Sequence, residues 1–323
     1  MKLLGKMLHN AMLYNNVKAD NRVVTIHNTD HDGYGFVSMY AIQSSDSVEF
    51  TISKKDYQTL SMFDQMDIAI KDNKISVKTK NGKITIANLT DIDMLIPNID
   101  DVYDTQIKPN DFLPGRKFVG NDKVKIQSNG CNCEPNGYFI SDSHVFYIFV
   151  KDTYLKNKIN IPKEAFDYIG DMTTCSTDEK IVVFANPERG QMFYTTLINV
   201  SMNIPKLEYS EIFKAAFDKA ELHETFKLLK PYSKFVEFKY INGQMHLLTS
   251  EETNNFDIIV SCDVINGTKL QTYQSIDNLL KIIDLSDVSD VTLSFNKNMC
   301  FYQNDDVKAG SLHYRGTDKM EVE

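Results

Sequence analysis

Apolar and polar residues alternate along several stretches of the chain, and the clearest stretch covers residues 67–87. The segment IAIKDNKISVKTKNGKITIA places apolar side chains at every second position and breaks at Asp72-Asn73 and Asn81-Gly82. Alternation with period two, interrupted by such dipeptides, is typical of antiparallel strands joined by tight turns. We therefore predict a meander with one face on the core and one face in water.

A helix is predicted immediately before this meander, over residues 53–63. Ser53 supplies a side-chain cap, and Tyr57, Leu60 and Phe63 follow at helical spacing. The apolar run VEFTI at residues 48–52 indicates a strand that leads into the helix. The unit is thus a strand, a short helix and paired strands.

The same unit recurs twice further along the chain. A strand at residues 159–161 and a helix at 162–169 precede the strand patterns KIVVFA and MFYTTLI. A strand at residues 269–273 and a helix at 275–283 precede VTLSF and GSLHYR. Equivalent apolar positions, at Tyr57, Phe166 and Leu279, lie roughly 110 residues apart. This repetition favours three similar domains, which we divide near Pro97 and Pro205 into residues 1–97, 98–205 and 206–323.

A second kind of helix is predicted near the start of each repeat. Residues 2–10 and 209–221 each place apolar side chains on one side of a helix, with Leu3, Leu4, Met7 and Leu8 in the first and Ile212, Phe213, Ala216 and Phe217 in the second. The corresponding stretch at residues 112–119 contains Pro114-Gly115, so its helix must be short or distorted. Because strand patterns dominate the rest, the predicted fold class is α+β.

Composition narrows the class of protein. The chain has 323 residues, 42% of them hydrophobic, and a formal net charge of −9, which excludes a disordered chain and argues against a protein that coats nucleic acid through bulk positive charge. The five cysteines are an odd number, and no apolar run approaches the length of a membrane span. Cys131 and Cys133 have no second Cys or His pair at zinc spacing. We expect a soluble intracellular protein with reduced thiols, no metal and no membrane association.

The segment ISKKDYQTLSMFDQMDIAIKDNKISVKTKNGKITIANLTDIDMLIP resembles the first domain of the bacterial β sliding clamp, the processivity subunit of replicative DNA polymerase. Later segments extend the likeness. SDSHVF is similar to the family's T-D-G-H-R-L strand, INIPKEAF to its I-P-x-K helix start, and TTLINVSMNIP to the junction that follows. SEIFKAAFDKAEL is similar to its L-L-x-A-x-x-R-A helix, and SLHYRG to its final strand.

The resemblance implies three tandem DNA-clamp domains per subunit, with antiparallel sheets outside and helices lining a central hole. Two subunits would close head to tail into a ring around duplex DNA. A closed ring holds DNA by linkage, so it needs neither tight phosphate contacts nor base readout, and an acidic protein can have this role. The resemblance further implies a processivity factor without enzymatic activity or cofactor, whose partners are double-stranded DNA, a DNA polymerase, a clamp loader and a second copy of the chain. The composition suggests a phage version, acting in the cytoplasm of a bacterial cell or an infected host.

A hydrophobic cleft for short partner peptides is also implied. The positions carried over are Ile126, Ser141, Ser143, His144, Val145, Phe146, Pro205, Leu207, Leu312, His313, Tyr314 and Arg315. Such a cleft needs apolar walls, because an unpaired buried charge costs more than the peptide returns. Taken singly, each apolar residue is better explained by core or strand-edge packing, whereas the set taken together favours the cleft. Ser143 and Val145 replace the family's Gly and Arg, which leaves the accepted peptide sequence open.

Two further sets of residues follow from the resemblance. Basic residues on the predicted hole-lining helices are candidates for DNA contact, namely Lys2, Lys6, Arg116, Lys117, Lys163, Lys214 and Lys219. Ile84, Leu222 and His223 stand where the family joins its subunits. The polar His223 predicts a weaker interface than an aliphatic residue would give.

Two other functions remain open. IHNTDHDGYG is similar to the first metal-binding strand of DHH-type phosphoesterases, where His27, Asp30 and Asp32 would be ligands. The chain lacks that family's later Asp-His-His run, and Thr29-Asp30 also fits a hairpin turn of the clamp family. The second alternative is a monomeric polymerase accessory factor of the same architecture, which would need a basic face to hold DNA.

Overall fold

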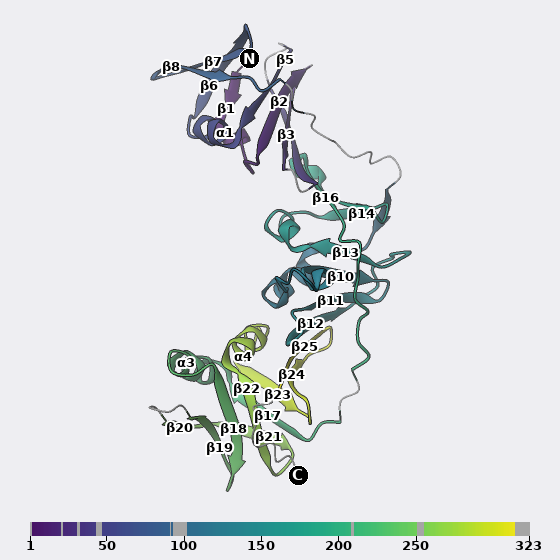
Figure 1. Cartoon of the computed structure of the whole chain (residues 1–323), viewed down its shortest axis with the longest axis vertical. Helices are drawn as coiled ribbons and strands as arrows, with labels where there is room; N and C mark the ends of the chain where they lie inside the picture. Colours follow the sequence, from purple (N-terminus) through teal and green to yellow (C-terminus); the bar gives the residue numbers. More distant parts are fainter. Residues whose placement is uncertain are drawn as a thin grey trace. The chain divides into compact units, whose positions relative to one another are not determined.

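The computed structural model describes residues 2–20, 22–30, 33–42, 47–90, 92, 102–207, 210–250 and 255–313. The chain divides into two compact units, one formed by Met1–Leu113 with Tyr154–Asn199 and the other by Pro114–Thr153 with Val200–Glu323. The units are drawn in Figure 1 and described separately below. The division of the sequence into three domains remains a prediction.

Antiparallel strands make up most of the first unit. They are β1 (Lys2–Leu4), β2 (Tyr14–Asp20), β3 (Val23–Thr29), β4 (Tyr34–Ala41), β5 (Val48–Ser53), β6 (Gln65–Lys71), β7 (Lys74–Thr79), β8 (Gly82–Ala87), β9 (Tyr103–Thr105), β13 (Ile159–Pro162), β14 (Thr174–Thr177), β15 (Ile181–Asn186) and β16 (Gln191–Thr196). The helices are α1 (Lys54–Ser61), α2 (Pro109–Phe112) and the 3-10 turns η1 (Gly5–Met7), η4 (Lys163–Asp167) and η5 (Pro187–Arg189). One sheet has the order β5-β2-β3-β4-β16-β15-β14-β9, and a smaller sheet has the order β1-β6-β7-β8.

The core of this unit follows from the alternation seen in the sequence. Val17 and Ile26 on the large sheet pack in one buried cluster with Ile75 and Val77 on the small sheet. Helix α1 begins where the Ser53 hydroxyl accepts the Asp56 N–H, and it adds Tyr57 and Leu60 to the cluster. The predicted helix at residues 53–63 and the predicted meander at 67–87 are confirmed.

The second unit is also built mostly of antiparallel strands. Its strands are β10 (Gly130–Glu134), β11 (Gly137–Ser141), β12 (Val145–Val150), β17 (Phe213–Asp218), β18 (Phe235–Ile241), β19 (Gln244–Ser250), β20 (Asn255–Val260), β21 (Cys262–Asn266), β22 (Leu270–Ser275), β23 (Asp290–Phe295), β24 (Met299–Gln303) and β25 (Val307–Leu312). Its helices are α3 (Lys219–Leu229), α4 (Ile276–Ile283) and the 3-10 turns η2 (Leu113–Phe118) and η3 (Ile126–Ser128). The large sheet includes the order β10-β11-β12-β25-β24-β23-β17-β21, and the small sheet has the order β20-β19-β18-β22.

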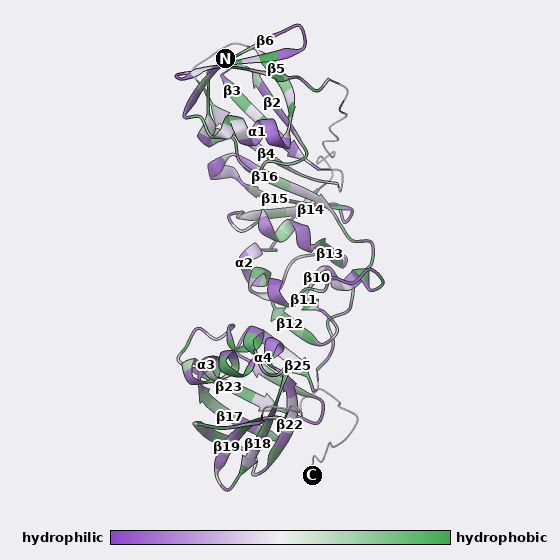
Figure 2. Cartoon of the chain, turned by 60° about the vertical axis from the view of Figure 1, so that its left-hand side comes forward, coloured by the Kyte–Doolittle hydropathy of each residue, from purple (hydrophilic) through white to green (hydrophobic). Residues whose placement is uncertain are grey.

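Aromatic side chains fill the space between these two sheets. Phe238 on β18 lies within 6.3 Å, centroid to centroid, of Phe217, Phe226 and Phe295. Helices α3 and α4 lie beside each other (Figure 1). Figure 2 shows hydrophilic and hydrophobic colour alternating along the strands of both units, as expected when each strand has one face on the core. The Ser275 hydroxyl caps α4, so the helix predicted at residues 275–283 is confirmed.

The helix predicted at residues 2–10 is wrong. Residues 2–4 form strand β1, which pairs with β6, and a single 3-10 turn follows. The reason is a close approach at Gly5, whose N–H donates to the Phe63 carbonyl at 3.1 Å. A Cβ at Gly5 would lie 2.1 Å from that oxygen, so the backbone must turn here. The apolar residues that suggested a helix instead alternate and turn into the core.

The helix predicted at residues 209–221 is also wrong. Residues 213–218 form β17 between β23 and β21, and the helix begins only at Lys219, after the Asp218 side-chain cap. Phe213, Ala215 and Phe217, at every second position, are buried. Because Ala216 is also apolar, the same residues fitted the spacing of a helix. Pairing on both sides of the strand decides between the two periods. The helix predicted after Pro162 is only the 3-10 turn η4, whereas the short, distorted helix expected at residues 112–119 is confirmed by α2 and η2.

Candidate peptide-binding site

An apolar cluster lies on one face of β11 and β12 in the second unit. Phe139, Phe146 and Ile148 are buried there, and Met299 of β24 packs against them. Met202, Ile204 and Leu207, from the segment between β16 and β17, cover part of the same cluster. This surface is therefore assembled from two distant parts of the sequence.

Strand register places the neighbouring side chains. Phe146 pairs with Ser141 on one side and with Gly310 on the other, so all three positions share a face. A Cβ at Gly310 would lie 2.7 Å from the Phe146 ring, which means that the missing side chain makes room for the ring. Leu312 lies two residues further along the same face and is 43% exposed. The face thus continues from buried Phe146 to exposed Leu312.

The covering segment is held by hydrogen bonds. The Met202 N–H donates to Asn132 Oδ1 at 2.6 Å, and the Ile204 N–H donates to Glu134 Oε1 at 3.0 Å. Asn132 is fully buried, and its Nδ2 also donates to the Gln127 carbonyl at 3.2 Å. The segment is consequently tied to β10 before it reaches Pro205 and Leu207.

A tight turn at one end of this surface carries Ser143 and His144. Asp142 Oδ1 accepts the N–H groups of His144 and Val145, each at 2.9 Å, and Ser143 has a positive φ of 79°. The His144 carbonyl accepts the Leu312 N–H at 2.9 Å. The turn and the last described strand therefore form one rigid corner.

The structure brings together part of the predicted cleft. Ser141, Phe146, Leu207 and Leu312 belong to the surface, and Pro205 lies within its covering segment. Val145 points to the opposite side of the sheet, because neighbouring residues of a strand alternate between faces, and His313, just after β25, is buried. Ile126 is 44% exposed on η3, next to the Gln127 carbonyl that Asn132 binds. Tyr314 and Arg315 lie outside the described residues.

Several members of the surface were not predicted. They are Phe139, Ile148, Met202, Ile204 and Met299. The alternation in YFIS and VFYIFV carried a signal for Phe139 and Ile148, since both are two residues from positions that were chosen. Nothing in the sequence pairs Met299 with Leu312, because that contact depends on the register of β24 and β25.

The predicted DNA-contacting residues differ in what they do. Lys2, Lys6 and Arg116 are exposed, and Lys163 is half-buried at the start of η4. Lys117 is ion-paired with Asp284 at 2.5 Å, and Lys214 lies on β17 with Glu211 at 3.6 Å. The Lys219 ammonium donates to the Ser286 carbonyl and so holds the start of α3. Lys2 and Lys214 are on strands, not on the helices predicted for them.

The predicted subunit contacts are also unequal. Ile84 is half-buried on β8, which is an edge strand of the small sheet. Leu222 is 1% exposed and belongs to the core of the second unit, so its side chain is not available at the surface of this chain. His223 is half-exposed on α3, with Nε2 3.5 Å from Asp284 Oδ1.

The metal site proposed around His27 finds no support in the described residues. His27 is buried on β3, where its Nε2 lies 2.6 Å from the Tyr194 hydroxyl, and burial lowers its pKa to about 4. Asp30 accepts the Tyr34 hydroxyl at 3.3 Å in the hairpin between β3 and β4, and Asp32 lies outside the described residues. Within the part of the chain that the structure describes, no group of three or more His, Cys, Asp and Glu could hold a metal ion. None of its described helices is long and apolar enough to cross a membrane.

Solved structures with the same fold include bacterial sliding clamps. The chain aligns with the DNA polymerase sliding clamp of Pseudomonas aeruginosa at TM-score 0.83 and 13% identity, over 98% of this chain and 99% of that one. The clamp of Bartonella birtlesii bound to griselimycin aligns at TM-score 0.85 and 10% identity, over 98% of this chain and 99% of that one. The clamp of Bacillus subtilis aligns at TM-score 0.83 and 11% identity, over 95% of this chain and 92% of that one. No protein-family model and no curated protein sequence matches the chain. The chain therefore has the fold of the β subunit of bacterial DNA polymerase III along nearly its whole length.

Proposed function

We propose that this protein is a DNA sliding clamp, which encircles duplex DNA as a head-to-tail homodimer and tethers a DNA polymerase and other partners through the apolar surface described above. The likeness in fold over nearly the whole chain supports this function, and sliding clamps are not enzymes. A ring that is linked around DNA needs no tight contacts to the phosphates, so a net charge of −9 is compatible with this function.

The order of elements supports three tandem domains. Three consecutive strands, a single strand, a short helix and three more strands follow one another in β2–β4, β5, α1 and β6–β8. The same order occurs in β10–β12, β13, η4 and β14–β16, and again, with the extra strand β21, in β18–β20, β22, α4 and β23–β25. This order contains the unit of a strand, a short helix and paired strands that the sequence predicts, and so supports the proposed division.

The carrying observation is a pair of strand edges left open by this repeat. Each repeat has three strands before its single strand and helix, and three strands after them. The last of the three leading strands pairs with the last of the three closing strands in the following repeat, as β4 pairs with β16 and β12 pairs with β25. The leading strands of the third repeat end with β20, and the closing strands of the first repeat end with β8. Both β20 and β8 are edge strands of their sheets. Pairing β8 of one protomer with β20 of another would repeat the same junction and close a ring.

The two edges are complementary in charge. Lys74, Lys78 and Lys83 are exposed on β7 and β8. Asp257 on β20 and Glu224 on the adjacent α3 are exposed at the other edge. Half-buried Ile84 and Ile258 supply the apolar part of the proposed contact, in place of the buried Leu222. Complementary charge favours the head-to-tail arrangement over pairing of like edges.

For DNA contact the proposal keeps Lys2, Lys6, Arg116, Lys117 and Lys163. It omits Lys214, which lies on the interior strand β17 with Glu211 at 3.6 Å, and Lys219, which is tied to Ser286, whereas Lys2 is exposed on the edge strand β1. A polymerase or clamp-loader peptide would lie on the surface between Phe146 and Leu312. Cytoplasmic action and a phage origin belong to the same proposal and rest on the sequence alone.

Ring closure on DNA is the decisive test. Cysteines placed at Lys83 and Asp257 are bridged by a bismaleimide after mixing with nicked circular DNA, and a protein with only its native cysteines is the control. A closed ring withstands a denaturing wash on circles and is lost when the circle is cut. Equal retention on circular and linear DNA would instead favour the monomeric accessory factor.

A further inference from the structure

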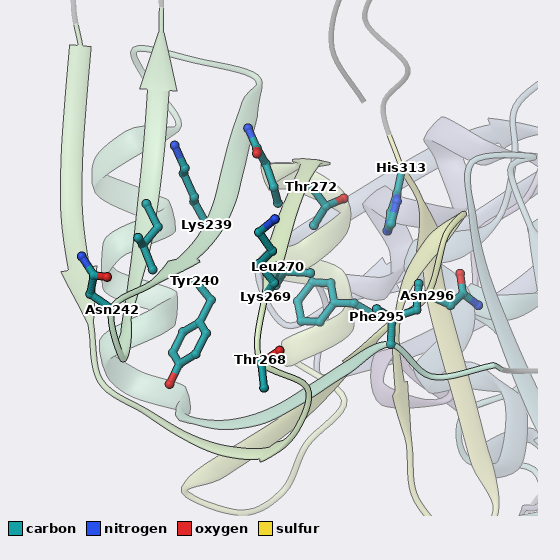
Figure 3. A pocket seen from close by; sticks show the side chains of 13 residues that line it. Lys239, Tyr240, Asn242, Thr268, Lys269, Leu270, Thr272, Phe295, Asn296 and His313 are labelled. Carbon is teal, nitrogen blue, oxygen red and sulfur yellow. The ribbon is translucent and has the colours of Figure 1, made fainter. Parts of the chain in front are cut away.

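A cavity of about 410 Å³ opens in the second unit; its lining includes none of Phe139, Phe146 and Ile148, but it does include His313, the residue that follows Leu312. Its lining includes the apolar residues Ile212, Leu270 and Phe295 and the basic residues Lys239 and Lys269, together with the buried His313. Figure 3 shows Lys239 and Tyr240 on one side of the cavity and Asn296 and His313 on the other, with Leu270 between them. The volume is in the range that holds a small ligand or a few residues of a peptide.

Two lysines, Lys239 and Lys269, are among the described residues that line this cavity. None of the described residues that line it is Asp or Glu, although the chain carries a net charge of −9. Glu237, two residues before Lys239 on β18, already accepts hydrogen bonds from Gln271 Nε2 at 2.7 Å and from the Tyr273 hydroxyl at 3.0 Å. Lys239 forms no ion pair with any residue in the described part of the chain. An anionic ligand is therefore favoured over a cationic one.

The cavity also runs along an open strand edge. Strand β22 pairs with β18 on one side, and no described strand pairs with its other side. Leu270 and Thr272 from the inner face of β22 and Gln271 from its outer face all line the cavity. A ligand in the cavity would consequently contact the backbone edge of β22 and side chains from both faces of that strand.

We propose that this cavity binds an extended peptide of a partner protein, added as a strand to β22, in which acidic and apolar residues alternate. Side chains of an added strand alternate between the two faces. The apolar residues would lie beside Leu270 and Phe295, and the acidic residues beside Lys239 and Gln271. The site does not depend on ring formation or on DNA, so it stands or fails separately from the clamp function.

Fluorescence anisotropy of the full chain with the labelled peptide GELELELG tests this assignment. We expect saturable binding that is lost when lysine replaces each glutamate. Lys239→Glu should weaken binding about tenfold or more, since a charge pair is replaced by a repulsion. Lys227→Glu, on the exposed side of α3, is the matched control and should leave binding unchanged. If Lys239→Glu alters the circular-dichroism melt, Lys239→Met replaces it.

Backbone methylation separates strand addition from simple charge attraction. One peptide is N-methylated at its leucines and a second at its glutamates, so that each loses the N–H groups of one edge. Strand addition requires that one of the two loses binding and the other retains it. Equal binding of both peptides, unchanged binding by Lys239→Glu, or displacement of the peptide by an octathymidine that binds more tightly would overturn the proposal.

Discussion

Lys117 and Asp284 form an ion pair in which Nζ and Oδ2 are 2.5 Å apart, and His223 lies 3.5 Å from the other oxygen of the same carboxylate. Asp284 thus already pairs with Lys117, a lysine that is proposed above to contact DNA. A phosphate approaching Lys117 must compete with this carboxylate.

Asp284→Asn should therefore strengthen binding of short duplex DNA at low salt by a few-fold. The logarithm of the binding constant should fall more steeply with the logarithm of salt concentration, by about one unit of slope, because one more lysine is released to a phosphate. Asp277→Asn is the matched control, since Asp277 pairs with Lys230 at 2.7 Å on the same pair of helices. An identical salt slope for wild type and Asp284→Asn would remove Lys117 from the DNA-contacting set.

Leu312→Asp should weaken capture of a QLxLF-type peptide by about tenfold or more. The substitution places a charge on the exposed end of the apolar surface, where an unpaired carboxylate would be desolvated by the peptide. Phe146→Asp is less suitable, because Phe146 is buried and its loss would disturb the fold. Val288→Asp, at a side chain 65% exposed elsewhere in the unit, is the control in a titration calorimetry experiment. Equal affinities for the two variants would contradict the site.

The sequence predicted the order of strands and helices better than their boundaries. Ser53 and Ser275 mark helix starts because a capping hydroxyl is a local signal, and both predictions are confirmed. Residues 213–218 satisfy both helical and strand periods, and only pairing with β21 and β23 makes them a strand. Likewise, Phe146 was found from its segment, whereas Met299 joins it through strand register that no local pattern encodes.

His27 should make stability depend on pH. Its pKa is about 4 in the folded protein against 6.5 ordinarily, so between these values the unfolded chain binds a proton that the folded chain does not. Stability is then complete above pH 6.5 and falls as pH decreases toward 4, by about 2 kcal/mol at pH 5. His27→Gln should lose less stability than wild type between pH 7.5 and pH 5 in urea titrations. His9→Gln, at an exposed side chain, should behave as wild type; a parallel loss in His27→Gln would refute the assignment.

Phe238→Ala should be among the most destabilising single substitutions in the second unit. The ring is fully buried and contacts three other phenylalanines, so its removal leaves a cavity between the sheets. The expected cost is about 3–5 kcal/mol, read from the shift of the urea transition. Met62→Ala, at a side chain 80% exposed, should change stability by less than about 0.5 kcal/mol. A shift below about 1 kcal/mol for Phe238→Ala would mean that this core is loosely packed.

Charge reversal at the open edges tests the head-to-tail dimer. Lys83→Glu on β8 and Asp257→Lys on β20 should each weaken the dimer several-fold, because each sets like charges opposite one another across the proposed pairing. The double variant restores opposite signs and should recover much of the loss. Lys18→Glu, on β2 in the interior of its sheet, is the control. Sedimentation velocity across a range of protein and salt concentrations measures the dimer; additive losses in the double variant would show that these two edges do not meet.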